Sequence, residues 1–220
     1  MASFFNLTLD TTAPAGLTLK LNNGAAYATS TAVTATIGLT DSVTTGYQMK
    51  IWGVAGAATE AEAAWATFVK SKAITLTTGD GQKTVSIKVR DDVGNETAAV
   101  TAKITLDTAV PVVTITGPDK SRISKVATFN VSAFSFSANA DFEEYKIKVV
   151  PSESSLENAG TQIPVTAGST NTSGTAGGYK ADTAINVTIN GADLEAASSG
   201  DGVKIVKVFV KNAAGTWSVA

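Results

Sequence analysis

Gly79–Thr97 reads GDGQKTVSIKVRDDVGNET, and Gly200–Ser218 reads GDGVKIVKVFVKNAAGTWS. The two stretches align without a gap, and each places alternating apolar residues between glycine-containing turns. Alternation with a period of two between turns is typical of a β-strand. A duplicated strand motif in one chain predicts two copies of a single β-module.

The residues on either side of each predicted strand have a defined conformational role. Glycine supplies backbone at positive φ, and aspartate hydrogen-bonds to nearby backbone. We therefore predict turns defined by Gly79, Asp80, Gly81 and Gly94 in the first copy, and by Gly200, Asp201, Gly202 and Gly215 in the second.

Two more matches extend the repeat over most of the chain. Leu9–Pro14 corresponds to Leu106–Pro111 at an offset of 97 residues, and Tyr47–Ile51 corresponds to Tyr145–Val149 at an offset of 98. The strand motif itself is offset by 121 residues. The second copy therefore carries an insertion, which we place at about 152–182.

Composition and length favour an all-β protein of two domains. Thr, Val, Ser, Ala and Gly dominate the 220 residues, which suits strands and tight turns. A module of about 100 residues has the usual size of an immunoglobulin-like sandwich. We predict two tandem immunoglobulin-like β-sandwiches, the first at 1–105 with an extra N-terminal strand at 3–10, and the second at 106–220.

One segment departs from the β pattern and is rich in Ala and Glu. Thr59–Lys70 opens with the Thr and Glu spacing of a capping box. Trp65 and Phe68 fall on one helical face, so we predict a short helix across one end of the first sandwich, with Trp65 plugging the core. A helical turn is expected at Ala192–Ser198 in the second sandwich.

The insertion in the second copy is polar and loses the strand periodicity. Its centre, Gly168–Gly178, has the composition of a flexible loop. A long loop on a β-scaffold is a common place for binding. A solvated excursion without a partner explains the composition equally well, so both interpretations stay open.

Several classes of function lack the residues that they need. The chain has no His and no Cys, which excludes Ser-His-Asp triads, Cys-His pairs and ordinary zinc sites. The net charge is −2 and only 16% of the residues are charged, so we expect no nucleic-acid or membrane partner. The basic run Lys120–Lys125 is interpreted as a solvated turn. We predict a protein that is not an enzyme and binds no cofactor.

Calcium is the one metal for which the sequence offers candidate ligands. Asp10, Asp80 and the pair Asp91–Asp92 supply carboxylates, the ligands that calcium prefers. In the second copy the pair is replaced by Asn212 and Ala213. We therefore interpret these aspartates as turn formers and predict no metal site.

The order of the motifs resembles a known family. This order is similar to that of immunoglobulin-like repeats of bacteria and bacteriophages: Leu-Asp-Thr-x-x-Pro at 9–14, Tyr-x-Met-x-Ile at 47–51, the predicted helix with Trp65 and Phe68, Gly-Asp-Gly-x-Lys-x-Val at 79–85 and Arg-Asp-x-x-Gly-Asn at 90–95. Such repeats occur in cell-surface proteins and in phage tail, fibre and head-decoration proteins. The resemblance is therefore specific for the fold and much less so for the function.

The resemblance implies a non-enzymatic structural protein, for which two settings are open. The first is a bacteriophage virion, with the chain on the head, tail or baseplate, assembled in the bacterial cytoplasm beside other virion proteins or copies of itself. The initial Met, the absence of an export signal and the lack of Cys favour this setting. Weak adhesion to host-surface carbohydrate is a further expectation. The alternative is a spacer or adhesin module of a bacterial cell-surface protein.

Apolar residues on an outer face of the second sandwich predict a covered surface. The valines of the second strand motif are expected to face the core, so Ile205 and Phe209 face outward, where the first copy has Thr84 and Lys88. An apolar face of this kind needs cover. Either the insertion or a neighbouring subunit supplies it.

The N-terminal segment repeats the closing strand expected at the end of the first copy. Ser3–Asp10 corresponds to Val100–Asp107 at the offset of 97 residues. We predict that Phe4–Leu9 is an orphan closing strand that adds to an open sheet edge. Pairing with its own first sandwich, donation to the second sandwich of a neighbouring subunit, and closure within one chain stay open. The candidate subunit interface consists of Phe4, Phe5, Leu7, Leu9, Ile205 and Phe209.

Overall fold

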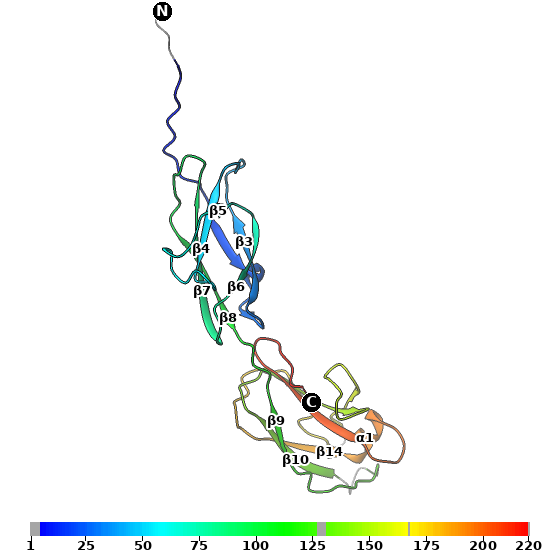
Figure 1. Cartoon of the computed structure of the whole chain (residues 1–220). Helices are drawn as coiled ribbons and strands as arrows, with labels where there is room; N and C mark the ends of the chain where they lie inside the picture. The colour runs from blue at the N-terminus through cyan, green and yellow to red at the C-terminus, as the bar shows by residue number, and fades with distance from the viewer. Residues whose placement is uncertain (1–4, 127–130, 167, 220) are drawn as a thin grey trace, which may run out of the picture. The chain divides into compact units, whose positions relative to one another are not determined.

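The computed structural model describes residues 5–126, 131–166 and 168–219 and divides into two compact units (Figure 1). Domain 1 is Met1–Thr108 and domain 2 is Ala109–Ala220. The division falls three residues after the expected boundary at 105, because the last strand of domain 1 continues to Leu106. Each unit has a separate hydrophobic core.

Domain 1 consists of two sheets that face each other across one core. The first has the order β1-β3-β6, and the second has the order β2-β8-β7-β4-β5. A short 3-10 turn, η1, covers Asn22–Gly24. The strands are β1 (Thr18–Leu21), β2 (Tyr27–Ala28), β3 (Ala32–Gly38), β4 (Gln48–Trp52), β5 (Ala66–Thr67), β6 (Ser71–Thr75), β7 (Gly81–Arg90) and β8 (Val100–Leu106).

Domain 2 also consists of two facing sheets, and in its described residues the second sheet has four strands where that of domain 1 has five. One sheet has the order β14-β10-β9, and in the other β11 lies between β15 and the short strands β12 and β13. The elements are β9 (Val113–Thr116), β10 (Val131–Ala138), β11 (Glu144–Val150), β12 (Thr161–Gln162), β13 (Ser173–Gly174), β14 (Ile185–Asn190), α1 (Gly191–Ala197) and β15 (Ile205–Lys211). The two sandwiches confirm the predicted all-β, immunoglobulin-like fold, and α1 confirms the helical turn expected near Ala192.

The predicted turns are confirmed on both copies of the strand motif. The matched glycines adopt nearly the same positive φ in each pair, a region that favours glycine. The values are 84° at Gly79 and Gly200, 118° and 128° at Gly81 and Gly202, and 98° and 87° at Gly94 and Gly215.

The helix predicted at Thr59–Lys70 is wrong. One half of the capping box forms, since the backbone N–H groups of Ala58 and Thr59 donate to Glu62 Oε2 at 2.7 and 3.1 Å. The turn ends there, and the chain then extends to form β5 beside β4. An isolated helix of this length is marginal in water, so strand pairing and the burial of Phe68 prevail.

The match between Tyr47–Ile51 and Tyr145–Val149 is wrong by two residues. Val89 of β7 pairs with Met49, whereas its copy Val210 pairs with Tyr145. Tyr145 therefore occupies the place of Met49, at an offset of 96 residues. Both phases keep apolar residues at alternate positions, so the sequence pattern does not distinguish them.

The insertion at 152–182 is part of the sandwich rather than a solvated excursion. Ile163 is fully buried in the core of domain 2, and Thr172 donates its hydroxyl to the Ile163 carbonyl at 2.8 Å. β12 and β13 both pair with β11. At its far end Tyr179 stacks on Phe142, with ring centroids 4.9 Å apart. These few buried residues lie in a mostly polar segment, so its composition did not indicate that it packs into the sandwich.

The extra strand predicted at 3–10 is not found over residues 5–10, and the alternative in which the segment pairs with its own first sandwich is not met there. Phe5, Leu7 and Leu9 are 85%, 87% and 86% exposed. Phe4 lies outside the described residues. We call residues 5–9 the N-terminal arm.

Candidate binding groove in domain 2

The closing strand of domain 1 has no counterpart in the described part of domain 2. In domain 1, β8 pairs with β7 from Gly81–Leu106 to Ile87–Val100 and contacts β1 of the opposite sheet. Ile104 and Leu106 of β8 are each only 1% exposed, so this strand completes the core. The strand predicted over Ala99–Asp107 is thereby confirmed.

The counterpart of β7 in domain 2 is β15, which pairs with β11 along one edge. At its C-terminal end, Val210 exchanges backbone and side-chain hydrogen bonds with Ser218. Along Gly202–Val208, the described residues place no strand at the other edge. Backbone N–H and C=O groups along such an edge are a template for strand addition.

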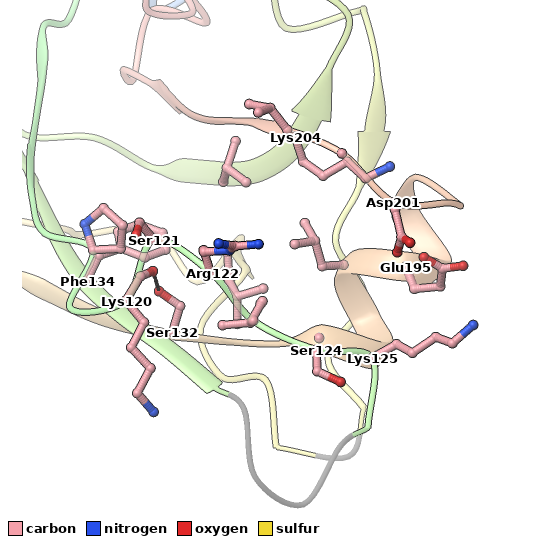
Figure 2. Close-up of a pocket in the computed structure, with 18 of the residues that line it drawn as sticks. Lys120, Ser121, Arg122, Ser124, Lys125, Ser132, Phe134, Glu195, Asp201 and Lys204 are labelled. Atoms are coloured by element: carbon pink, nitrogen blue, oxygen red, sulfur yellow. Dashed lines mark hydrogen bonds between the residues drawn. The ribbon is translucent and has the colours of Figure 1, made fainter.

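A cavity of about 1160 Å³ opens beside this edge (Figure 2). We call it the groove. Gly202–Lys204 and Val206 line one side, and segments from β9, β10, α1 and the loop before β10 line the rest. Its apolar lining includes Ile115, Ile123, Phe134, Ile189, Leu194 and Val206.

The groove reaches the core of domain 2. Ile123, Phe134, Leu194 and Val206 are partly buried and pack against that core. In domain 1, Val85 holds the place of Val206 and is fully buried, because it pairs with Ala102 of β8. The groove is therefore the space that a closing strand fills in the other copy.

Charged residues surround the groove, and several are engaged in local bonds. Glu195 accepts the backbone N–H of Gly200 at 3.1 Å, and Lys204 donates to the Ser199 carbonyl at 3.0 Å. Figure 2 shows Lys120, Arg122 and Lys125 on the loop that forms one wall. The basic side chains of the run Lys120–Lys125 are exposed, as a solvated segment requires, but the run also lines the groove, which the sequence interpretation did not anticipate. The apolar Ile123 inside the run was the available signal.

A second feature, present in both domains, is a set of side chains that fixes the turn after the repeated strand. Thr97 Oγ1 accepts the N–H of Val89 at 3.1 Å, and Ser218 Oγ accepts the N–H of Val210 at 3.1 Å. The backbone N–H of Thr97 and Ser218 returns a bond to the same valines. We call this arrangement, with Asp91 or Asn212 at its centre, the turn lock.

The centre of the turn lock differs chemically between the domains. Asp91 accepts from the backbone N–H groups of Val93 and Asn95 at 3.0 and 2.8 Å, and from Asn95 Nδ2 at 2.8 Å. Asn212 accepts from the N–H of Thr216 at 2.8 Å. Burial by itself raises the pKa of Asp91, but the hydrogen bonds from Asn95, Gly94 and Val93 outweigh it and lower that pKa.

Each turn lock also holds the segment that leads into its domain. Asn95 Nδ2 donates to the Asp10 carbonyl at 3.3 Å, and Asn212 Nδ2 donates to the Ala109 carbonyl at 3.2 Å. Asp10 follows the N-terminal arm, and Ala109 follows β8. The arm therefore precedes the locked entry into domain 1, just as β8 precedes the locked entry into domain 2.

The insertion, rather than a neighbouring subunit, covers Phe209. Lys207 Nζ, on the same face of β15, donates to the carbonyls of Glu153 and Ser155 at 2.9 and 2.6 Å. Lys148 Nζ on β11 donates to the Glu157 carbonyl at 2.7 Å. Phe209 is 0% exposed beneath this loop, which corrects its place among the interface candidates. Ile205 is half-buried, and its interface role stays a prediction.

A tryptophan lies beside two cations on the outer face of each domain. Trp65 has Lys50 Nζ at 5.1 Å and the Arg90 guanidinium at 4.4 Å from its ring centroid. Trp217 has Lys146 and Lys211 at 4.6 and 5.2 Å. Trp65 is half-buried in this position, so its expected role as a core plug is wrong.

Of the aspartates weighed as calcium ligands, Asp10 and Asp91 accept hydrogen bonds within local turns, whereas Asp80 bonds to a residue distant in the chain. Asp80 Oδ1 accepts the backbone N–H and the hydroxyl of Thr108 at 3.0 and 2.8 Å. Asp10 accepts the N–H of Thr12 at 2.9 Å, and Asp91 holds the turn lock. Over residues 5–126, 131–166 and 168–219, no group of three or more His, Cys, Asp or Glu side chains is placed to hold a metal ion. No helix in this part of the chain has the length and apolarity of a membrane span.

Neither a family model nor a curated protein sequence matches the chain. Among solved structures, the fibronectin(III)-like modules of Clostridium thermocellum CbhA align over 92% of this chain and 90% of theirs, with 9% identity and a TM-score of 0.46. Chitinase ChiA74 from Bacillus thuringiensis aligns over 92% of this chain and 30% of its own, with 14% identity and a TM-score of 0.31. A Corynebacterium diphtheriae protein described as membrane anchored aligns over 93% and 56%, with 15% identity and a TM-score of 0.33.

This chain spans less than two thirds of the length of the last two proteins. Such low identities and TM-scores carry no argument about function.

Proposed function

We propose that the chain is a non-catalytic spacer, whose two sandwiches separate other parts of a bacterial surface protein or of a phage particle. The observation that carries this proposal is the turn lock. Asp91, Thr97, Asn212 and Ser218 are all buried, so polar groups that recur between the copies are used to fix strand ends. A spacer depends on such fixed ends and on domains that hold their shape independently.

The separate cores support the same function. Domain 1 and domain 2 each enclose their own cluster of buried apolar side chains. Each can therefore resist unfolding without help from the other. A tandem of self-supporting sandwiches sets a spacing by adding modules, whatever binding residues its surface carries.

Single-molecule pulling on the 220-residue chain tests the spacer proposal. We expect two separate unfolding events, one for each domain. Thr97→Val should lower the unfolding force of one event only, because it removes one turn lock. Unravelling without resolved force peaks would contradict a role in holding parts of an assembly at a distance.

Immunogold labelling distinguishes the two settings of a spacer. An antibody against the chain is applied to cells of the source bacterium and to the phage particles that the culture releases. Gold on the cell envelope supports the surface-protein setting, and gold on particles supports the virion setting. Gold found only inside cells and on no particle would overturn both. A glycan array with the purified chain tests the expected weak adhesion to carbohydrate.

A further inference from the structure

The N-terminal arm carries an apolar pattern that matches the inward face of β8. At the offset of 97 residues, Phe5, Leu7 and Leu9 correspond to Ala102, Ile104 and Leu106. Ile104 and Leu106 are buried in the core of domain 1, whereas Leu7 and Leu9 are among the most exposed apolar residues described. Asn6 and Thr8 fall at the positions of Lys103 and Thr105, which alternate with the inward residues.

The groove of domain 2 offers the surface that β8 meets in domain 1. Its free edge is the copy of the β7 edge, and its lining supplies apolar side chains where β8 buries Ile104 and Leu106. We propose that the arm of one copy inserts into the groove of a second copy and pairs antiparallel with Gly202–Val206. This inference goes beyond the spacer function, since a spacer that stays monomeric is still a spacer.

The register follows from the pairing of β7 with β8. Gly81 pairs with Leu106 and Val85 with Ala102, so at the two offsets Leu9 pairs with Gly202 and Phe5 with Val206. Leu7 and Phe5 then enter the groove, and Asn6 lies opposite Ile205 on the outer face. Main-chain hydrogen bonds would supply affinity and the alternate apolar side chains would supply specificity, as in strand addition generally.

Within domain 1, the arm begins at the opposite end of β7 from Thr108, the last residue of the domain. Asp10 is held by Asn95, just beyond the C-terminal end of β7, whereas Thr108 is held by Asp80 at the N-terminal end. The ten residues of β7 span about 33 Å. The five residues of the arm reach at most about 18 Å from Asp10. The arm therefore does not reach Thr108 within domain 1, and we assign the groove to the arm of a second copy; the disulfide test below separates this from closure within one chain.

The turn lock fits this arrangement. Asn212 holds Ala109 just after β8, and Asn95 holds Asp10 just after the arm. In one chain, β8 closes domain 1 and the residue after it is held by the lock of domain 2. An arm inserted in the groove of another copy would likewise close that domain 2, and the residue after the arm would be held by the lock of its own domain 1. Each chain carries one donor and one acceptor, so the contact is heterologous and builds a head-to-tail row.

Sedimentation velocity of the full chain over a wide concentration range gives the first test. We expect concentration-dependent oligomers. Leu7→Asp should weaken the association at least about tenfold, because it places a charge in an apolar groove. Thr8→Asp, on the outward face of the same arm, should leave it unchanged. A chain that stays monomeric throughout, or oligomers unaffected by Leu7→Asp, would overturn the proposal.

Disulfide trapping tests the register and the partner together, and the chain has no Cys to interfere. A mixture of the Asn6→Cys and Ile205→Cys chains should form a disulfide-linked dimer under mild oxidation. A mixture of Thr8→Cys and Ile205→Cys, two residues out of register, should form at least about tenfold less. Equal yields from both mixtures would overturn the register. A monomeric disulfide in the Asn6→Cys, Ile205→Cys double variant, without cross-linking in the mixture, would overturn donation between copies.

Discussion

Domain 1 and domain 2 share their turn locks and differ at their sheet edges. The repeated strand, its positive-φ glycines and the Thr97 or Ser218 acceptor are retained in both. Domain 1 closes its sandwich with β8, whereas domain 2 covers one face with the insertion and leaves the groove beside β15. The lock is therefore the part that the two copies share, and the sheet edge, where strands can be added, is the part that differs.

The largest expected difference in stability is between substitutions at matched positions of β8 and the N-terminal arm. Ile104→Ala should destabilise domain 1 by about 2–5 kcal/mol, because it removes a buried side chain and leaves a cavity. Leu7→Ala, at the equivalent place in the arm, should change the stability of the dilute monomer by less than about 0.5 kcal/mol. Urea unfolding monitored by hydrogen exchange resolves the two domains. Similar losses from both changes would mean that the arm already packs within its own chain.

The second comparison concerns the outer face of the repeated strand, which the insertion covers in domain 2 but not in domain 1. Phe209→Ala should cost domain 2 about 3–5 kcal/mol, since its ring is completely buried. Lys88 occupies the equivalent place in domain 1 and forms ion pairs with Glu60 and Glu96 at 2.8 and 3.7 Å. Lys88→Ala should cost much less, because ion pairs open to solvent contribute little to stability. Thermal unfolding of the two variants provides the measurement, and a small effect of Phe209→Ala would show that the loop does not protect this face.

The sequence predicts the repeated parts of the molecule well, because their signals are local. Glycine at a turn and alternation along a strand are set by backbone geometry within a few residues. The turns at Gly79 and Gly200 and the strand Val100–Leu106 were therefore predictable. The interpretation of Asp91 as a turn former rests on the same local logic and agrees with its hydrogen bonds.

The features that sequence reasoning missed depend on contacts between distant segments. Thr59–Lys70 has helical composition, but pairing of β5 with β4 decides its conformation. The burial of Ile163 gives a polar insertion a place in the core. The groove joins a basic loop, α1 and an open edge that are far apart in the chain. Periodicity in a single segment carries no information about such pairings.

The two turn locks should contribute equally if they are the shared part of the scaffold. Thr97→Val and Ser218→Ala each remove the oxygen that accepts a buried valine N–H, at 3.1 Å in both domains. Each should cost its own domain about 1–3 kcal/mol. Domain-resolved hydrogen exchange measures both. A loss confined to one domain would show that only that copy depends on the lock.

The smallest expected effect concerns pH, because only domain 1 has a titratable group at the centre of its lock. The folded-state pKa of Asp91 is lowered, so its contribution is present above the unfolded pKa of about 3.9 and is lost as the pH falls through the folded value. Asp91→Asn should therefore destabilise domain 1 by about 1 kcal/mol at neutral pH. The gap from the parent chain should shrink as the pH falls below about 4. Urea unfolding at a series of pH values measures this gap, with exposed Asp92→Asn as the matched control. A gap that stays constant down to acid pH would mean that the Asp91 charge does not stabilise the turn, and no gap at neutral pH would mean that an asparagine, as in domain 2, makes an equivalent lock.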